Sequence, residues 1–216
     1  MYHSLVRQVP ELKSMLIPDA DYDIDLGGGF ATPEISEIFS RSFVSYDILD
    51  PKRVSDWGLH LPAALGISED VVRRHRQALL TQAFHQFDVF TDRFPVDGQA
   101  YNIVSFGFLN SPVNSVSVHQ PALPLPLKRF ATLVAGLRCI LELVRLGKSV
   151  SLVAVSRPDL PLMNRIVHLR FEKGRILDIS LPPHPIAQVR FAITSTLQNN
   201  LNDTELDFCS ALKVSL

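Results

Sequence analysis

The sequence predicts an α+β fold, a single domain in which a mainly antiparallel sheet is packed by a long central helix over residues 126–146. Two observations carry this prediction: an apolar stripe of helical period in the central stretch, and apolar residues that recur with period two on either side of it. A helical N-terminal region and an extended acidic arm precede the sheet. The predicted division is an arm over 1–31 and a domain over 32–216, helical over 32–94 and sheet plus helix over 100–216. At 216 residues the chain can bury a substantial core.

The predicted arm is acidic and has little continuous period. The first fifty residues carry nine acidic and three basic groups, and the rest of the chain has the opposite balance. Four aspartates alternate with other residues and lead into three glycines, which is typical of a loop. They are Asp19, Asp21, Asp23 and Asp25, followed by Gly27-Gly28-Gly29. We interpret the aspartates as a solvated self-association arm and the glycines as a joint between arm and body.

The acidic segment partly matches two kinds of ligand site. Aspartates two apart resemble the start of a calcium loop, but counting from Asp21 the required glycine and glutamate positions hold Leu26 and Thr32. A glycine-rich turn can hold a phosphate, but no buried strand is expected before it, and Asp25 would repel the anion. The sequence therefore predicts neither a metal nor a cofactor.

Two helices are predicted before the sheet. Thr32 followed by Pro33 is a typical helix start, and the apolar residues after it share one face of a short helix. Ser68 is a favourable N-cap for a second, longer helix that reaches about residue 91, and the acidic residues after it suit the positive end of a helix. The four-residue stretch 95–98, which contains proline and glycine, ends this helical region.

The central part of the chain is expected to alternate between strands and one helix. Residues 101–109 and 113–119 read as two strands that pair as a hairpin. The central helix over 126–146 carries its apolar residues on one face, and Gly147 suits the left-handed position after its last turn. Residues 149–155 are apolar on both faces, which favours an interior strand.

A second hairpin is predicted over residues 165–171 and 175–181. A three-residue loop with Gly174 in the left-handed conformation places Leu169 opposite Leu177, whereas a two-residue loop would place it opposite a charged residue. We therefore expect the three-residue loop. Farther along, the spacing favours a helix over 186–200, although it also suits a strand, and strict alternation predicts a final strand over 206–216.

Basic residues on the second predicted helix form a patch suited to an anionic partner, such as RNA or an acidic membrane surface. Its members are Arg73, Arg74 and Arg76, with Lys52, Arg53, Lys128 and Arg129 as extensions. The aromatic residues are mostly phenylalanines at core spacing, whereas single-stranded nucleic acids are bound on stacking platforms. A solvated helix face is the structural alternative for the same residues.

Catalytic signatures are absent from the sequence. It holds no nucleophile elbow, no zinc-protease motif, and no histidines or cysteines at metal-binding spacing. An enzyme would need a composite site that brings distant residues together, with His85, Asp88 and His168 as its candidates. A surface hydrogen bond between His85 and Asp88 on one helix is the alternative for the first two.

The cysteine count and the apolar segments indicate the cellular compartment of the protein. Cys139 and Cys209 are too few for a disulfide framework and too far apart for a CxxC motif, so free thiols are expected. The first residues lack the basic and apolar regions of a signal peptide, and no stretch approaches the roughly 20 apolar residues of a membrane span. We therefore expect a soluble, intracellular protein.

The favoured function at this level is non-enzymatic interaction or assembly, with another protein or a second copy of the chain as partner. By layout, a compact α+β chain with an extended arm resembles the small matrix or accessory proteins of viruses. That resemblance implies self-association through the acidic arm and binding of an anionic partner. Two alternatives stay open: an RNA-binding or membrane-surface-binding protein that uses the basic helix, and a hydrolase or transferase with a composite site.

Overall fold

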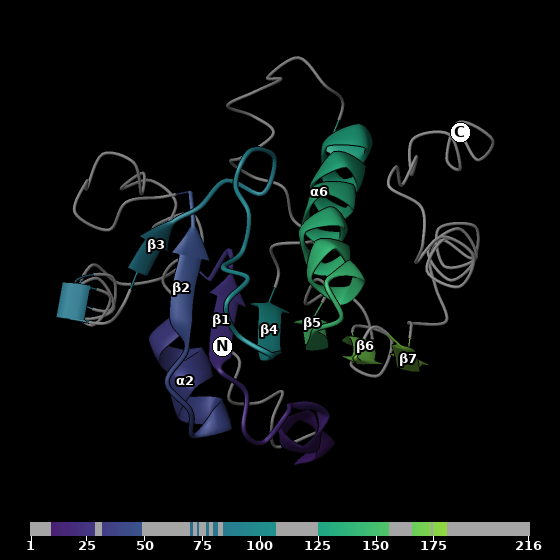
Figure 1. Cartoon of the computed structure of the whole chain (residues 1–216). Coiled ribbons are helices and arrows are strands. Elements are labelled where there is room, and N and C mark those ends of the chain that lie inside the picture. Colours follow the sequence, from purple (N-terminus) through teal and green to yellow (C-terminus); the bar gives the residue numbers. More distant parts are fainter. Residues whose placement is uncertain are drawn as a thin grey trace.

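The computed structural model describes residues 10–28, 32–48, 84–106, 125–155, 166–173 and 175–180, together with five helical positions between 70 and 81. In chain order the elements are the 3₁₀ helix η1 (Pro10–Met15), β1 (Tyr22–Leu26), α2 (Thr32–Phe39), β2 (Val44–Asp47), β3 (Phe84–Gln86), β4 (Ala100–Phe106), α6 (Leu125–Arg145), β5 (Ser149–Val155), β6 (Ile166–Glu172) and β7 (Arg175–Ser180). Figure 1 shows one open sheet with α6 lying along it.

The sheet is mostly parallel, and the prediction of a mainly antiparallel α+β fold is wrong. Its seven strands follow the order β3-β2-β1-β4-β5-β6-β7. The first five pair in parallel, and only β6 and β7 are antiparallel to their neighbours. Parallel neighbours need long crossover connections, which α2 supplies between β1 and β2 and α6 supplies between β4 and β5. The chain is therefore an α/β protein with a mixed sheet.

The two helices lie on opposite faces of this sheet. Successive residues of one strand point to opposite faces, and Ile103 and Val104 of β4 belong to two different apolar clusters. The cluster around Ile103 contains the buried residues of α6, including Ile140 and Val144. The cluster around Val104 contains Ile35, Ile38 and Phe39 of α2, with Leu12 and Leu16 from the N-terminal segment. The sheet is thus covered on both faces.

The strand order reverses between β1 and β4. From β1 the chain passes through α2 to β2 on one side, and from β4 it passes through α6 to β5 on the other. In open α/β sheets, ligands bind outside the carboxyl ends of the strands at such a switch point. In Figure 1 the arrowheads of β1 and β2 point toward the same edge of the sheet. This edge is therefore where a site is expected.

The predicted arm over 1–31 contains the central strand of the sheet. β1 pairs with β2 on one side and with β4 on the other, and its last three residues are buried. Before it, Leu12 and Leu16 of the N-terminal segment are buried beside Val153 of β5. Ser151 of β5 donates a hydrogen bond of 2.6 Å to the carbonyl of Met15. The boundary predicted at residue 31 falls inside the connection from β1 to α2.

The long helix predicted up to residue 91 ends earlier than expected. Five described positions from Asp70 to Thr81 are helical, but Phe84–Gln86 form β3, which pairs with β2. After β3, residues 87–99 contain no helix and cross the same face as α6, where Phe87, Val89 and Phe94 join the apolar cluster of that face. Phe84 and Phe87, which fall within the predicted helix, therefore belong to a strand and to the extended connection after it.

The predicted hairpin over 165–171 and 175–181 exists as β6 and β7, but its register differs. Glu172 pairs with Arg175 across a two-residue loop, in which Lys173 has a φ of 47°. A register shift between Arg170 and Phe171 then places Leu169 opposite Ile179 instead of Leu177. The bulge restores apolar pairing without the three-residue loop that we expected.

Several predicted elements lie outside the described residues. They are the strand over 113–119, the helix over 186–200 and the strand over 206–216. The first strand of the predicted 101–119 hairpin is β4, which pairs in parallel with β1 and β5. The predicted helix over 126–146 is α6, Leu125–Arg145, and Gly147 after it has the expected positive φ of 75°. Among the described helices, none is long and apolar enough to cross a membrane.

Candidate ligand site at the carboxyl ends of β1 and β2

Asp25 is a fully buried carboxylate near the carboxyl end of β1. Its side chain has no exposed surface, and neither of its oxygens has a hydrogen-bond partner. Burying a carboxylate without a partner costs several kcal/mol as an order of magnitude, so such a group usually serves a ligand or keeps its proton. Asp25 is therefore the residue from which the site is built.

The turn after β1 brings Gly28 and the start of α2 against this carboxylate. A Cβ atom at Gly28 would overlap both the Asp25 carboxylate and the Thr32 hydroxyl, so only glycine fits there. Thr32 is the first residue of α2, is fully buried, and its hydroxyl has no hydrogen-bond partner. The positive N-terminal end of α2 and the unpaired Asp25 carboxylate thus lie on either side of the turn at Gly28.

On β2, two further polar side chains share the face of Asp25. Ser45 is paired with Asp25 across the parallel ladder, is fully buried, and its hydroxyl has no hydrogen-bond partner. Asp47 lies two residues farther at the end of β2, with 8% of its surface exposed. Its backbone carbonyl accepts a hydrogen bond of 2.9 Å from the Phe87 amide, which fixes the end of the strand.

Burial raises the pKa of the Asp25 carboxyl to about 7, well above its usual value of 3.8. Loss of hydration is the largest cause, and the negative charge of Asp47 adds to it. The Thr32 hydroxyl lies close enough to oppose the rise, although its geometry does not complete a hydrogen bond with the carboxylate. Near neutral pH this carboxyl is divided between its protonated and ionised forms.

Aromatic packing on the other face of β2 supports the end of that strand. Tyr46 is buried and packs at an angle against Phe87, with 5.3 Å between ring centroids, and against Phe94 at 5.7 Å. Phe87 and Phe94 stack on each other at 4.9 Å. Because Tyr46 is held on one face, its neighbours Ser45 and Asp47 are directed to the opposite face.

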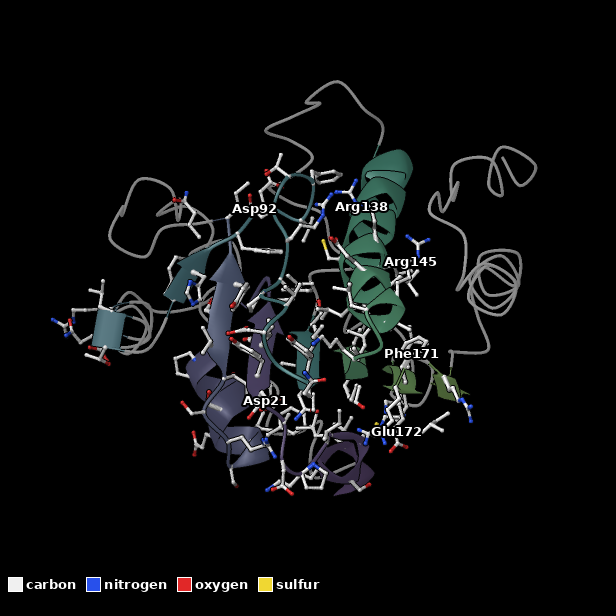
Figure 2. The ribbon with its side chains drawn as sticks, viewed as in Figure 1. Asp21, Asp92, Arg138, Arg145, Phe171 and Glu172 are labelled. Atoms are coloured by element: carbon white, nitrogen blue, oxygen red, sulfur yellow. The ribbon has the colours of Figure 1, made fainter. Side chains whose placement is uncertain are left out.

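Residues 87–94, after β3, are tied to α6. Cys139 donates from its thiol to the Val89 carbonyl at 3.5 Å, and Arg138 donates to the Phe90 carbonyl at 3.0 Å. Arg93 and Glu142 form an ion pair of 2.8 Å. Figure 2 shows Asp92 and Arg138 at one end of the sheet and Asp21 at the other. These ties hold a segment of the chain next to the carboxyl ends of the strands.

The four aspartates of the predicted arm have different surroundings. Asp19 is exposed, and Asp21 accepts hydrogen bonds from the backbone amides of Gln99 and Ala100 at the amino end of the sheet. Asp23 pairs with Arg41 at 2.8 Å and accepts a hydrogen bond from Asn102. Only Asp25 lies at the carboxyl end of β1. Self-association through these four residues remains an expectation.

The predicted anionic-partner patch falls mostly outside the described residues. Arg73 is exposed and pairs with Asp70 at 2.6 Å, while Arg74, Arg76, Lys52 and Arg53 are not described. Lys128 and Arg129 lie on α6, but their side chains are likewise outside the description. Whether these residues lie together is therefore not tested, and the patch stays a prediction.

The residues of the predicted composite site do not all lie together. His85 is exposed on β3, and Asp88 follows that strand and accepts a hydrogen bond from the Phe90 amide. His168 is buried on β6, 3.5 Å from the Ser151 hydroxyl. Four strands separate β3 from β6, which is about 24 Å at the usual strand spacing.

The sequence alone did not predict that Asp25, Thr32, Ser45 and Asp47 belong to one site. The missed signal was the alternation of Tyr22, Ile24 and Leu26 with aspartates, which is the pattern of a strand rather than a solvated arm. With that strand in place, Gly27 and Gly28 begin a strand-to-helix turn. Asp47 then lies about 20 residues after the turn, the usual position of a ribose-binding acid.

Comparisons with known proteins found similarity among solved structures only. No family model matches the chain, and no curated protein is similar to it in sequence. The chain is similar to DesVI of Streptomyces venezuelae, with 14% identity, a TM-score of 0.37, and 82% of this chain and 76% of that chain covered. The glycopeptide N-methyltransferase MtfA, solved with S-adenosyl-L-methionine, gives 13% identity, a TM-score of 0.31, and coverage of 76% and 65%.

A third similar structure is the sugar N-methyltransferase KedS8 of a Streptoalloteichus species, with 13% identity, a TM-score of 0.33, and coverage of 83% and 72%. At these TM-scores the likeness fixes neither a shared fold nor a shared activity. The hypothesis of a non-enzymatic, viral matrix-like assembly protein is nevertheless contradicted. It rests on a mainly antiparallel layout with an extended acidic arm, whereas the sheet is mostly parallel, has β1 in its interior, and contains the switch point typical of ligand-binding α/β proteins.

Proposed function

We propose that the chain is a transferase that binds a positively charged nucleoside cofactor at the carboxyl ends of β1 and β2, with S-adenosylmethionine as the candidate. The observation that carries the proposal is the buried Asp25 carboxylate, which has no hydrogen-bond partner and lies against the glycine turn at the start of α2. The switch point of the sheet supplies the location.

The charge of the site favours this cofactor over a dinucleotide. A pyrophosphate would sit on the glycine turn, where Asp25 and Asp47 would repel it. A ligand with a net positive charge instead compensates the buried carboxylate and offsets its desolvation cost. The sulfonium and ammonium groups of S-adenosylmethionine outweigh its one carboxylate, which gives the cofactor a net positive charge.

The remaining contacts follow from the positions of residues at this edge. Asp47 stands at the end of β2 and is suited to accept hydrogen bonds from the two ribose hydroxyls. Gly28 lets the backbone of the turn approach a ligand closely because a side chain there would overlap Asp25. When bound, S-adenosylmethionine supplies an electrophilic methyl group that a nucleophilic acceptor can take. The protein's own residues bind and orient the cofactor.

The test is isothermal titration calorimetry of the full chain with S-adenosylmethionine, NAD⁺ and ATP in turn. We expect saturable binding of S-adenosylmethionine and at least tenfold weaker binding of the two phosphate-bearing ligands. Asp47→Ala should weaken binding of S-adenosylmethionine about 10- to 100-fold, the range expected on losing a hydrogen bond to a charged group. Asp19→Asn is the matched control because Asp19 is exposed and distant from the glycine turn along the chain.

Two results would contradict the proposal. One is the absence of S-adenosylmethionine binding by a protein that remains folded by circular dichroism. The other is tighter binding of NAD⁺ or ATP, which would identify a phosphate site on the same turn. Equal affinities of Asp47→Ala and the wild-type chain would remove Asp47 from the site while leaving the cofactor in place.

A further inference from the structure

We propose that Asp25 makes this site selective for the charge of its ligand. Its carboxyl loses its proton when a positively charged ligand binds and keeps the proton when a neutral ligand binds. A ligand with a net positive charge binds to the ionised carboxylate, and its neutral counterpart binds to the protonated carboxyl. This inference rests on the proposed function and deepens it, because methyl transfer converts a cationic cofactor into a neutral one. The protein would thereby favour binding of the cofactor before methyl transfer and its release after methyl transfer.

Within the part of the chain that the structure describes, no protein group neutralises the charge of Asp25. Both oxygens lack hydrogen-bond partners, and the side chain is closed off from solvent. The hydroxyls beside it on α2 and β2, from Thr32 and Ser45, likewise lack hydrogen-bond partners. A carboxylate in this environment requires either a proton or a nearby cation.

Among the described residues, the charged groups around Asp25 supply no such cation. On β1, the charge of Asp23 is matched by Arg41 at 2.8 Å. On β2, Asp47 adds negative charge, and the first turn of α2 carries the acidic Glu34. On the same face of β4, the nearest residues are the apolar Val104 and Phe106. The ligand and the proton therefore compete to neutralise the same group.

The charge balance of one turnover follows from this competition. Binding of a cation to the protonated site releases the Asp25 proton to solvent. Transfer of the methyl group removes the positive charge from the cofactor's sulfur, whose bonding electrons return to it, and the acceptor gives up its own proton. Asp25 then takes up a proton from solvent and the neutral thioether remains. Charge and protons balance over the cycle without any further reactant.

The experiment measures protons directly instead of activity. S-adenosylmethionine and S-adenosylhomocysteine are titrated at about pH 6 in two buffers with different ionisation enthalpies, which gives the number of protons exchanged on binding. With a pKa of about 7, wild-type protein should release close to one proton on binding the first ligand and close to none on binding the second. Between about pH 6 and pH 8, the affinity for S-adenosylmethionine should rise about tenfold and that for S-adenosylhomocysteine should fall about tenfold, so their ratio changes about 100-fold.

Two variants make the assignment. Asp25→Asn should abolish the extra proton release and reduce the preference for the cationic ligand about tenfold or more. Asp19→Asn removes the same charge from an exposed position and should behave as wild type, so the ligand's own ionisation cancels in the comparison. If Asp25→Asn does not fold, the wild-type pH series with the two ligands still decides the question.

The possible failures are distinguishable. Binding of S-adenosylmethionine without proton release, and with the same pH dependence as S-adenosylhomocysteine, overturns the proton exchange and leaves the proposed function standing. Binding of neither ligand at any pH overturns the proposed function, and the proton exchange falls with it. Proton release that persists in Asp25→Asn assigns the exchange to another group and overturns this inference alone.

Discussion

Asn102 on β4 holds the backbone of Ile17 with both ends of its carboxamide. Its Oδ1 accepts from the Ile17 amide at 2.7 Å, and its Nδ2 donates to the Ile17 carbonyl at 2.9 Å. The same Nδ2 donates to Asp23 at 2.8 Å. One fully buried side chain thus ties the N-terminal segment to the middle of the sheet.

Replacing this side chain should be costly because it would leave two buried backbone groups without partners. We expect Asn102→Leu to lower the free energy of unfolding by about 2–6 kcal/mol, from roughly 1–3 kcal/mol for each of the two orphaned groups. Urea denaturation followed by circular dichroism measures the loss. Asn102→Asp keeps the acceptor for Ile17 but places a second carboxylate beside Asp23, and it should also destabilise the chain. A loss below about 1 kcal/mol for Asn102→Leu would mean that water replaces the amide.

Two glycines should respond to alanine for different reasons. Gly28→Ala adds a methyl group that overlaps Asp25 and Thr32, so we expect about 1–3 kcal/mol of destabilisation and loss of ligand binding. Gly147→Ala meets no atom within 4 Å, and its cost of about 1 kcal/mol comes only from the positive φ. Adding Asp25→Ala should recover part of the stability lost in Gly28→Ala and none of that lost in Gly147→Ala. If Asp25→Ala recovered the same stability in both glycine variants, the clash in Gly28→Ala would not be with Asp25.

Stability should fall as pH rises from about 3.8 to about 7 and then level off. The folded Asp25 carboxyl keeps its proton up to about pH 7, whereas the unfolded chain releases it near its usual pKa of 3.8. Folding therefore takes up a proton between these values, and the folded state loses up to about 4 kcal/mol across that window. Urea unfolding at about pH 5 and pH 8 should show this slope for wild type and Asp19→Asn. In Asp25→Asn the slope should be absent, and a slope that persists there would exclude Asp25 as its source.

The thiol of Cys139 should react slowly in the folded protein. Burial raises the pKa of this thiol to about 11, and the thiol faces the Val89 and Asp92 carbonyls. Because the thiolate is the reactive form, a chromogenic disulfide reagent at about pH 8 should label the native chain far more slowly than the unfolded chain. The assay uses Cys209→Ser so that one thiol is followed. Rapid labelling of the native protein would show that residues 87–94 detach from α6 on that timescale.

The sequence predicted the elements with a strong local signal. The stripe of Ile140, Leu141 and Val144 identified α6, and the apolar run over 149–155 identified an interior strand. Pairing was not predictable in the same way because β1 bonds to β4 through residues far apart in sequence, such as Tyr22 and Tyr101. Local periods cannot show which distant strands meet, and the sheet was therefore assigned as antiparallel.

The candidate site was missed for a related reason. In the sequence, Asp25 is one of four similar aspartates. Only its burial near the end of β1 distinguishes it from the others. Burial of an acid runs against its usual preference for solvent, so composition argued for an arm. The site becomes visible only when β1, α2 and β2 are assembled, because Asp25, Thr32 and Ser45 have no shared motif.

The pairing of β1 with β4 also governs how the chain can be made. A nascent chain whose synthesis has not passed Phe106 can pair β1 with β2, but the other edge of β1 is still open. Open strand edges recruit other strands, and long-range parallel pairing forms slowly. This edge of β1 therefore stays open while residues 27–106 are made, which is more than a third of the 216-residue chain. The production of this protein should depend on holding chaperones and on elongation rate far more than the stability of the finished sheet would suggest.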